Sequence, residues 1–90
     1  MSVEDNSAAE SSCLLRLRVA AEADPGALPR LLASFQNLNV IPRRVVAEFG
    51  TGEVMHVQID LFGVPESRLT LIAAKLGQIP TVLNAYWQRL

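Results

Sequence analysis

Hydrophobic and polar residues alternate over the segment from Cys13 to Ala20. Three apolar residues fall on one side of an extended chain and two arginines on the other: Leu15, Leu17 and Val19 against Arg16 and Arg18. Strict alternation is typical of a strand in a sheet that has one buried face. The pattern therefore predicts a first strand whose apolar side chains face a core.

The spacing then changes to that of a helix, which we predict from about Pro25 to Leu38. The apolar stripe of this helix consists of Leu28, Leu31, Leu32 and Phe35. Asp24 is a good N-cap residue, and Pro25 suits the first helical position. Pro29 cannot donate an intrahelical hydrogen bond, so either the first turn is irregular or the regular helix starts nearer Gly26. Asn39 suits a left-handed exit from the helix.

The second half of the chain repeats this order of elements. A hairpin is predicted first, with strands at Arg43–Phe49 and Glu53–Phe62 and a tight turn at Gly50-Thr51-Gly52. A second helix follows over Pro65–Leu76, and a last strand over Val82 to about Gln88. Val45, Ala47 and Phe49 share one face of the first hairpin strand. In the last strand, Leu83, Ala85 and Trp87 are expected to face the helices.

The two helical stripes correspond residue by residue at a constant offset along the sequence. Leu28, Leu31, Leu32 and Phe35 match Leu69, Ile72, Ala73 and Leu76. A strand-helix-strand unit used twice, with a central hairpin, is the split βαβ arrangement. The sequence therefore predicts an α+β, ferredoxin-like βαββαβ sandwich, in which a four-stranded antiparallel sheet carries both helices on one face. The opposite face is expected to be polar, with Arg16, Arg18, His56, Gln58, Asp60, Asn84 and Tyr86.

Composition and charge narrow the functional classes. The chain has ninety residues, and we expect a disordered tail over residues 1–12 and one domain over residues 13–90. Of its nine acidic residues, three lie in that tail (Glu4, Asp5 and Glu10), which leaves six against eight Lys and Arg in the domain. This balance is too weak for nucleic-acid binding, and no apolar run is long enough to span a membrane. The single cysteine, Cys13, excludes an intrachain disulfide and a Cys-x-x-Cys metal site, so we expect a cytoplasmic protein without a cofactor.

The turn from the first strand into the first helix carries the strongest candidate chemistry. A helix N-terminus presents backbone N–H groups without intrahelical partners, and the helix dipole favours an anion there. The turn Ala23-Asp24-Pro25-Gly26-Ala27-Leu28 is therefore the place where a small acidic ligand would bind. The alternative is that Asp24-Pro25-Gly26 is a structural capping sequence and nothing more.

Other polar residues give weaker signals. His56 is the only histidine, and its nearest carboxylate on the same strand face, Asp60, lies about 13 Å away at the usual rise, so the two cannot form a dyad within one strand. We interpret His56 as a solvated or interface side chain, with an acid-base or ligand role as the alternative. Arg43-Arg44 is either a solvated pair or a holder of an anionic ligand or of a partner's carboxylates.

The segment Asp24-Pro25-Gly26-Ala27-Leu28, followed by Leu31-Leu32 and Phe35 and by a turn into Val45-Val46, resembles the ACT domain. This family comprises small-molecule-binding regulatory modules of amino-acid metabolism, and within it the chain is most similar to the short regulatory subunits of acetolactate synthase. The resemblance implies an effector at a dimer interface, with its carboxylate on the backbone of residues 24–28.

The chain departs from the family pattern at two positions. The family usually has Asp or Asn three residues before the glycine, where this chain has Ala23. Many amino-acid-binding members end the helix with Gly and carry Asn two positions later, where this chain has Asn39 and Ile41. The resemblance therefore implies an effector site formed by residues 23–28, Asn39 and Ile41, without the usual polar anchors for an amino group.

Three functional hypotheses follow. The first is a non-catalytic regulatory module that forms a homodimer, edge to edge or face to face, and binds a small amino acid or modulates a catalytic enzyme subunit such as that of acetolactate synthase. The second is a degenerate ACT module that serves only dimerisation or subunit association. The third is a small ferredoxin-like enzyme that uses His56.

Overall fold

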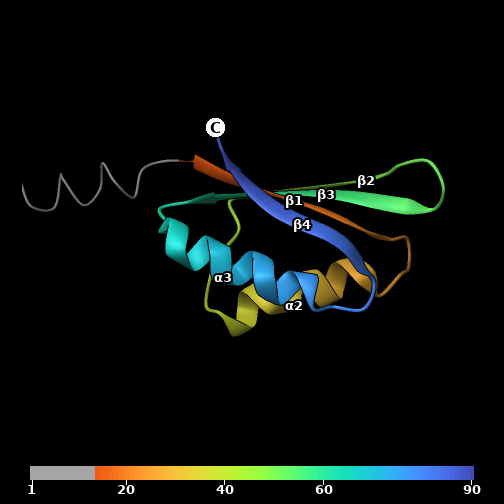
Figure 1. Ribbon diagram of the computed structural model, residues 1–90, viewed down its shortest axis with the longest axis horizontal. Coiled ribbons are helices and arrows are strands. Elements are labelled where there is room, and N and C mark those ends of the chain that lie inside the picture. The colour runs from red at the N-terminus through yellow and green to blue at the C-terminus, as the bar shows by residue number, and fades with distance from the viewer. Residues whose placement is uncertain (1–13) are drawn as a thin grey trace, which may run out of the picture.

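The computed structural model describes residues 14–90, which form four strands and two helices (Figure 1). In chain order these are β1 (Leu14–Glu22), α2 (Ala27–Asn37), β2 (Arg44–Phe49), β3 (Val54–Phe62), α3 (Glu66–Gly77) and β4 (Val82–Arg89). This is the βαββαβ order that the sequence predicted, which confirms the fold class. The predicted tail over residues 1–12 and Cys13 lie outside the described residues.

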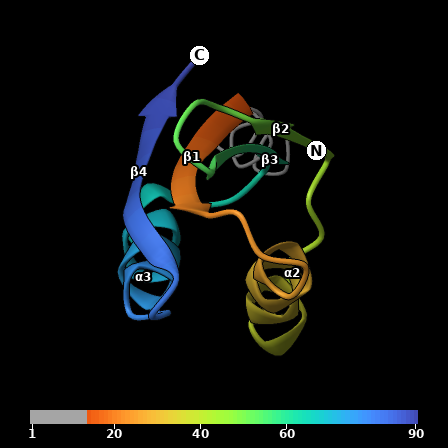
Figure 2. The same cartoon turned by 90° about the vertical axis from the view of Figure 1, so that its right-hand side faces the viewer.

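The four strands form one sheet in the order β2-β3-β1-β4, and all neighbours are antiparallel. Both helices lie on the same face of this sheet, α3 beneath β4 and α2 on the side of β2 and β3 (Figure 2). Within residues 14–90, neither helix lies on the other face, which we call the helix-free face. No helix within residues 14–90 combines the length and the hydropathy that spanning a bilayer requires.

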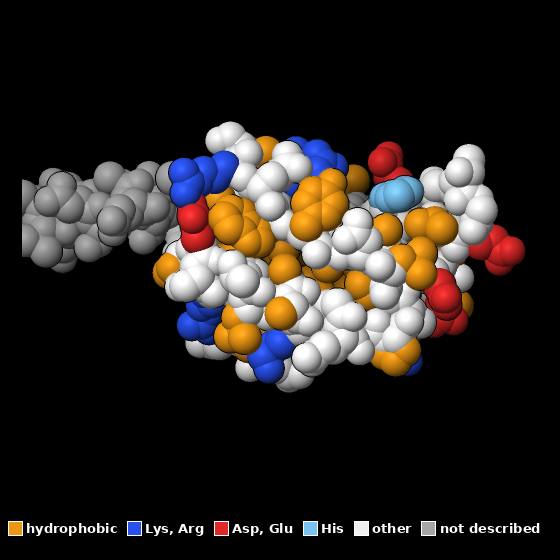
Figure 3. All heavy atoms as spheres, in the orientation of Figure 1, with side chains coloured by type: hydrophobic (Ala, Val, Ile, Leu, Met, Phe, Trp, Pro, Cys, Tyr) orange, Lys and Arg blue, Asp and Glu red, His pale blue; other side chains and the backbone are white. Residues whose placement is uncertain are grey.

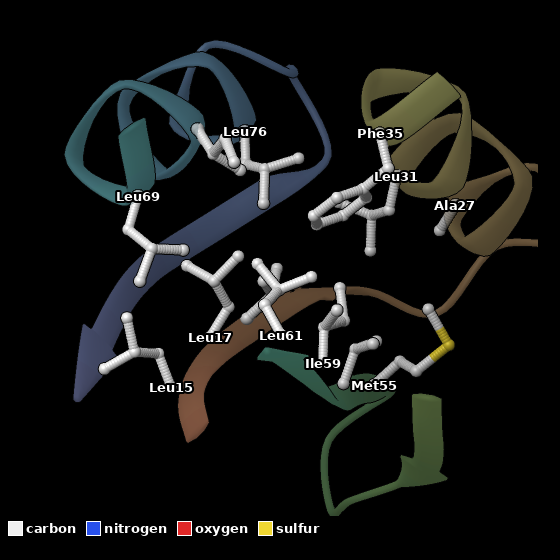
Figure 4. Close-up of a cluster of buried hydrophobic side chains, with 13 residues drawn as sticks. Leu15, Leu17, Ala27, Leu31, Phe35, Met55, Ile59, Leu61, Leu69 and Leu76 are labelled. Atoms are coloured by element: carbon white, nitrogen blue, oxygen red, sulfur yellow. The ribbon is translucent and has the colours of Figure 1, made fainter. Parts of the chain in front are cut away.

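The core lies between the sheet and the two helices (Figure 4). It is built from the matched positions of the two helical stripes, since Leu31 and Phe35 in α2 and Ile72 and Leu76 in α3 are all buried. The strands add alternate residues, as their pattern predicted: Leu15, Leu17 and Val19 from β1 and Met55, Val57, Ile59 and Leu61 from β3. Burying one such side chain stabilises the fold by about 1.5 to 3 kcal/mol, so this cluster fixes both helices on the sheet.

The structure confirms that Val45, Ala47 and Phe49 share a face, although neither α2 nor α3 covers them. These residues do lie on the helix side of the sheet, because they pair with Ile59, Val57 and Met55 of β3. All three are exposed nonetheless, and Phe49 retains 80% of its accessible surface. The physical reason is the position of β2 at the margin of the sheet, where α2 covers only part of its width. An apolar margin is therefore left open.

One prediction for β4 is wrong. Ala85 and Trp87 pack against the core as expected, but Leu83 is 56% exposed. The pairing register of β1 with β4 shifts between Ala20 and Ala21, so that Ala20 pairs with Asn84 and Ala21 with Val82. Leu83 is the extra residue of this bulge, and Val82 takes the inward position instead.

Candidate functional site

The turn between β1 and α2 is held by hydrogen bonds within the chain. The Ala23 N–H donates to the Glu53 carbonyl at 2.9 Å, which ties the turn to the β2–β3 hairpin. The Asp24 carboxylate accepts from the Gly26 N–H at 3.1 Å, and the Asp24 carbonyl accepts from the Ala27 N–H at 2.9 Å. The Gly26 and Ala27 N–H groups, which we expected to be available to a ligand, therefore already have acceptors within the turn.

The helix starts later than the capping pattern predicted. Gly26 is the N-cap residue, Ala27 is the first helical residue, and no side chain caps the helix. Asp24 is therefore not the N-cap, because its carboxylate bonds to the N–H two residues ahead, as Asp often does in turns. Pro29 becomes the third helical residue, where the N–H would have had no intrahelical partner, so the ring costs no hydrogen bond. The regular helix indeed starts nearer Gly26.

A positive environment remains at this helix start. Within residues 14–90, the Leu28 N–H makes no backbone hydrogen bond, and the first intrahelical bond runs from the Arg30 N–H to the Gly26 carbonyl at 3.1 Å. The guanidinium of Arg30 also turns back over the turn, since its Nη2 lies 3.8 Å from the position that a Cβ on Gly26 would occupy. The sequence analysis missed Arg30, although a residue four positions after Gly26 returns to the same side of a helix.

Asn39 and Ile41 lie at the other end of α2. Asn39 has a left-handed backbone with φ of 58°, which confirms the predicted exit. The Val40 N–H donates to the Phe35 carbonyl and the Asn39 N–H to the Gln36 carbonyl, the two bonds of a Schellman motif. The Asn at this position is therefore explained by the helix end. Ile41 is 89% exposed, which is unusual for an isoleucine.

A groove of about 520 Å³ runs between α2 and the open margin of β2. Its lining is mostly apolar and comprises Leu32, Phe35, Gln36, Asn39, Val40, Ile41, Pro42 and Val45. The groove thus contains Asn39 and Ile41 but none of residues 23–28. Because α2 has 11 residues, the two predicted halves of the site are separated by about 16 Å along the helix. A single chain does not bring them together.

The helix-free face holds the other polar residues that the sequence singled out. Asp60 is 4% exposed and accepts two hydrogen bonds from Arg16, at 2.7 Å from Nε and 3.2 Å from Nη2. The Arg16 hydrogen bond holds the pKa of the Asp60 carboxyl below its usual value against the opposing effect of burial, and the charges of Arg44 and Arg18 lower it further. With the Gln58 amide turned so that its oxygen faces Arg16, Gln58 accepts from the same guanidinium at 3.3 and 3.2 Å.

His56 has no part in this network. It is exposed, it pairs across the strands with Glu48 and Ala20, and its ring lies so close to Gly50 that a Cβ there would meet the imidazole at 2.7 Å. It lines a shallow hollow of about 270 Å³ together with Arg18, Glu48, Gln58, Asn84 and Tyr86. The Asp60 carboxylate is engaged by Arg16, so the structure pairs it with an arginine and not with His56.

The Arg43-Arg44 pair is divided between two environments. The Arg43 guanidinium lies 5.0 Å above the centre of the Phe62 ring, a cation–π contact. Arg44 is exposed at the start of β2 and pairs across the strands with Asp60. Neither residue lies with the turn of residues 23–28, so the predicted anion site gains no support from this pair.

Comparison with known proteins identifies the fold independently. A family model described as an ACT-like domain matches residues 7–90. The structure is similar to the ACT domain from GTP pyrophosphokinase of Chlorobium tepidum, with a TM-score of 0.72 and 16% identity over 84% of this chain and 97% of that one. The C-terminal domain of the MgtC protein from Mycobacterium tuberculosis gives a TM-score of 0.73 and 17% identity over 90% of each chain.

A larger protein contains the same fold as a part. A homoserine dehydrogenase from Thiobacillus denitrificans matches with a TM-score of 0.71 and 18% identity, over 90% of this chain and 18% of the dehydrogenase. A search of the curated proteins found no match. At these identities the similar structures show the fold, whereas the family match covers nearly the whole chain.

Proposed function

The chain belongs to the ACT-like domain family, and we propose that it is a regulatory module that binds a small amino acid between two copies of itself and thereby modulates a partner enzyme of amino-acid metabolism, such as acetolactate synthase. ACT domains are regulatory modules, which is the family-level part of this statement. The amino acid, the homodimer and the partner enzyme are our proposal.

The observation that carries the proposal is the separation of the two halves of the site. Residues 23–28 lie at the start of α2, and Asn39 and Ile41 lie at its end. If two copies pair antiparallel along their β2 margins, with α2 beside the α2 of the second copy, the start of each helix meets the end of the other. The same pairing would cover the apolar groove, the exposed Ile41 and Val45, and the unpaired edge of β2. One arrangement thus completes the site twice.

The residues at each half suit a zwitterion. The Leu28 N–H, the helix N-terminus and the Arg30 guanidinium attract a carboxylate. One oxygen of the exposed Asp24 carboxylate accepts from the Gly26 N–H, and the second oxygen can accept from an ammonium group. Asp24 directly follows Ala23, the position at which this chain has no polar side chain for an amino group. The apolar lining contributed by Leu32, Val40 and Ile41 favours an aliphatic side chain. The proposed effector class is therefore a small aliphatic amino acid.

Calorimetry with the twenty amino acids tests the proposal. We expect the wild type to bind an aliphatic amino acid and Gly26→Val to lose it, because a Cβ at Gly26 would meet Asp24 Oδ2 at 3.2 Å and cover the donors of the turn. Ala23→Asn should strengthen binding by about 5- to 30-fold, since it adds an acceptor for the ammonium group worth about 1 to 2 kcal/mol. His56→Ala, on the helix-free face, is the control and should bind like the wild type.

A second candidate function is supported by the internal hydrogen bonds of the turn. Because the Gly26 and Ala27 N–H groups already have acceptors, the domain is also consistent with association alone, without an effector. If neither the wild type nor Ala23→Asn binds any amino acid, while the wild type still co-purifies with a larger enzyme subunit, this second function replaces the first.

A further inference from the structure

The helix-free face is arranged as three rows of four facing residues, fixed by the pairing register of the strands. From β2 to β4, the row nearest the β2–β3 hairpin is Glu48, His56, Ala20 and Asn84. The middle row is Val46, Gln58, Arg18 and Tyr86, and the far row is Arg44, Asp60, Arg16 and Gln88. We refer to these as the hairpin row, the middle row and the far row.

Charge is distributed unequally between the two ends of this face. The hairpin row carries one carboxylate and no arginine, whereas the far row carries two arginines around the single Asp60. The same polarity extends beyond the face. Acidic residues at the hairpin end are Glu22, Asp24, Glu48 and Glu53, with Arg30 as the basic residue near the turn. Basic residues at the opposite end are Arg16, Arg43, Arg44 and Arg89, of which Arg16 pairs with Asp60 and Arg89 with Glu66, so Arg43 and Arg44 carry the excess of positive charge. In Figure 3 most of the visible acidic side chains lie at the hairpin end, where the single histidine is drawn in pale blue.

We propose that a second copy of this chain packs against the helix-free face, with its sheet turned end for end. The two-fold axis would lie midway between the two sheets, parallel to them and perpendicular to the strands, and it would pass between the two middle rows. The hairpin row of each copy would then face the far row of the other. This interface is separate from the β2 margin and does not depend on the effector site, so a chain that uses both surfaces would form a tetramer.

The rows are complementary in this orientation, position by position. Glu48 of one copy faces Arg44 of the second copy, and His56 faces Asp60 of the second copy. Ala20, the smallest residue of the face, faces Arg16 of the second copy, and the amides of Asn84 and Gln88 face each other. Sheets pack about 10 Å apart with their strands within about 30°, which moves positions at the sheet margin by about 5 Å. A glutamate and an arginine can span this separation.

The middle row tolerates its position on the axis. Val46 would meet Val46 of the second copy, which is an apolar contact on the two-fold axis. The second copy would also cover the hollow that Ala20 lines. Arg18 is not centred on the axis, because its Nε donates to Gln88 Oε1 in the far row at 3.3 Å. Its guanidinium is therefore directed away from Arg18 of the second copy and toward the hairpin row of that copy.

The charges at the sheet margin favour this orientation. A two-fold axis parallel to the strands would instead set Arg44 opposite Gln88 and Glu48 opposite Asn84 of the second copy, so that neither charge would meet its opposite. Four strands spaced about 4.8 Å apart and about 25 Å long give two faces a combined projected area of about 950 Å². This approaches the roughly 1,000 Å² that marks the lower limit of a specific interface, before surface relief is counted.

Charge reversal at the two facing positions tests the proposal by sedimentation velocity. Glu48→Arg and Arg44→Glu each place like charges opposite one another twice, so each variant alone should self-associate at least tenfold more weakly than the wild type through this face. Glu48 and Arg44 are both exposed, so neither change disturbs the core. An equimolar mixture of the two variants should recover the association, because both charge pairs are then opposite in sign. Lys75→Glu, on α3 at the other side of the molecule, is the matched control and should behave like the wild type.

The outcomes also separate this interface from the one at the β2 margin, which Ile41→Asp should disrupt. If Glu48→Arg and Arg44→Glu assemble like the wild type, or if their mixture stays as dissociated as each alone, the face-to-face interface is refuted. Loss of assembly in Ile41→Asp alone would then leave the β2 pairing standing. An antiparallel β2 pairing centred on Val46 would also set Glu48 opposite Arg44 of the second copy, because both residues belong to β2. Recovery in the mixture therefore supports the face-to-face interface when Ile41→Asp still assembles, and it refutes that interface when Ile41→Asp is monomeric. A wild type that is monomeric at hundreds of micromolar would refute both.

Discussion

The role of Asp24 shows what single residues can and cannot reveal from the sequence. An Asp before Pro-Gly suits both a helix N-cap and a turn in which the carboxylate bonds two residues ahead, and the two differ only in which N–H is taken. The sequence located the turn correctly but could not decide this competition. The structure shows the second arrangement, which leaves Leu28, and not Gly26 or Ala27, with an open backbone donor.

Asp60 was placed correctly on the polar face by strand alternation, but its burial was not predicted. Alternation fixes the direction of a side chain and says nothing of how far its neighbours cover it. Here the carboxylate is only 4% exposed and accepts two hydrogen bonds from the Arg16 guanidinium. The ion pair joins the two central strands, since Arg16 belongs to β1 and Asp60 to β3.

Removing the Asp60 carboxylate should make stability less sensitive to acid. The pKa of Asp60 is lowered in the folded chain, so ionised Asp60 stabilises the fold above its ordinary pKa of 3.8, and that contribution is lost as pH falls below 3.8 through the folded value. We expect Asp60→Asn to cost on the order of 1 kcal/mol near neutral pH, through the lost charge-assisted hydrogen bonds.

Urea denaturation of both proteins between pH 3 and pH 7 measures this effect. The difference in free energy of unfolding between wild type and Asp60→Asn should be constant near neutral pH and shrink as pH falls below 3.8. Asn84→Ala, which removes a polar side chain from the same face without removing a titrating group, should give an offset that does not change with pH. A constant difference for Asp60→Asn would show that the ion pair is not the source of its effect.

At the scale of the elements, the start of α2 explains why two prolines lie four residues apart. A helix beginning at Pro25 would place Pro29 in its interior, at a cost of about 3 kcal/mol. With Ala27 as the first helical residue, Pro29 occupies a position whose N–H needs no partner. The sequence contained both possibilities, and the hydrogen bond from the Arg30 N–H to the Gly26 carbonyl distinguishes them.

Replacing Pro29 by alanine should therefore change stability by less than about 1 kcal/mol. The ring fixes a backbone conformation that the first helical turn adopts in any case, so the main loss is the greater freedom of the unfolded chain. Thermal denaturation of the wild type and Pro29→Ala measures the change. A gain of about 3 kcal/mol on replacing the proline would mean that the regular helix extends back to Pro25.

The strands show a limit of another kind. Period-two patterns gave the correct face for the strand residues apart from Leu83, yet they could not give the position of a strand within the sheet or a bulge in its register. Phe49 is exposed because β2 lies at the margin of the sheet, and Leu83 because one extra residue interrupts the β1–β4 register. Both features depend on pairing between segments distant in the sequence.

At the scale of the whole molecule, the sheet has two open edges, formed by β2 and β4. The β2 edge lies beside the apolar groove with its exposed Ile41, so it is the edge that our proposed effector site requires a second copy to cover. The proposed site on one chain is incomplete for the same reason. The separation of its two halves follows from the length of the predicted helix between them. The open margin of β2 could not be predicted, because it depends on the order of the strands in the sheet.

Hydrogen exchange at two protein concentrations distinguishes the possible assemblies. If β2 pairs with the β2 of a second copy, its outward amides gain hydrogen bonds on association, so they should exchange at least tenfold more slowly at hundreds of micromolar than at one micromolar. The outward amides of β4 should exchange at the same rate at both concentrations and serve as the internal control. Face-to-face packing of the helix-free faces leaves both edges open and slows neither set. Protection of β4 in place of β2 would mean that copies join at the other edge, which leaves Asn39 and Ile41 of each copy far from residues 23–28 of the other and excludes the proposed effector site.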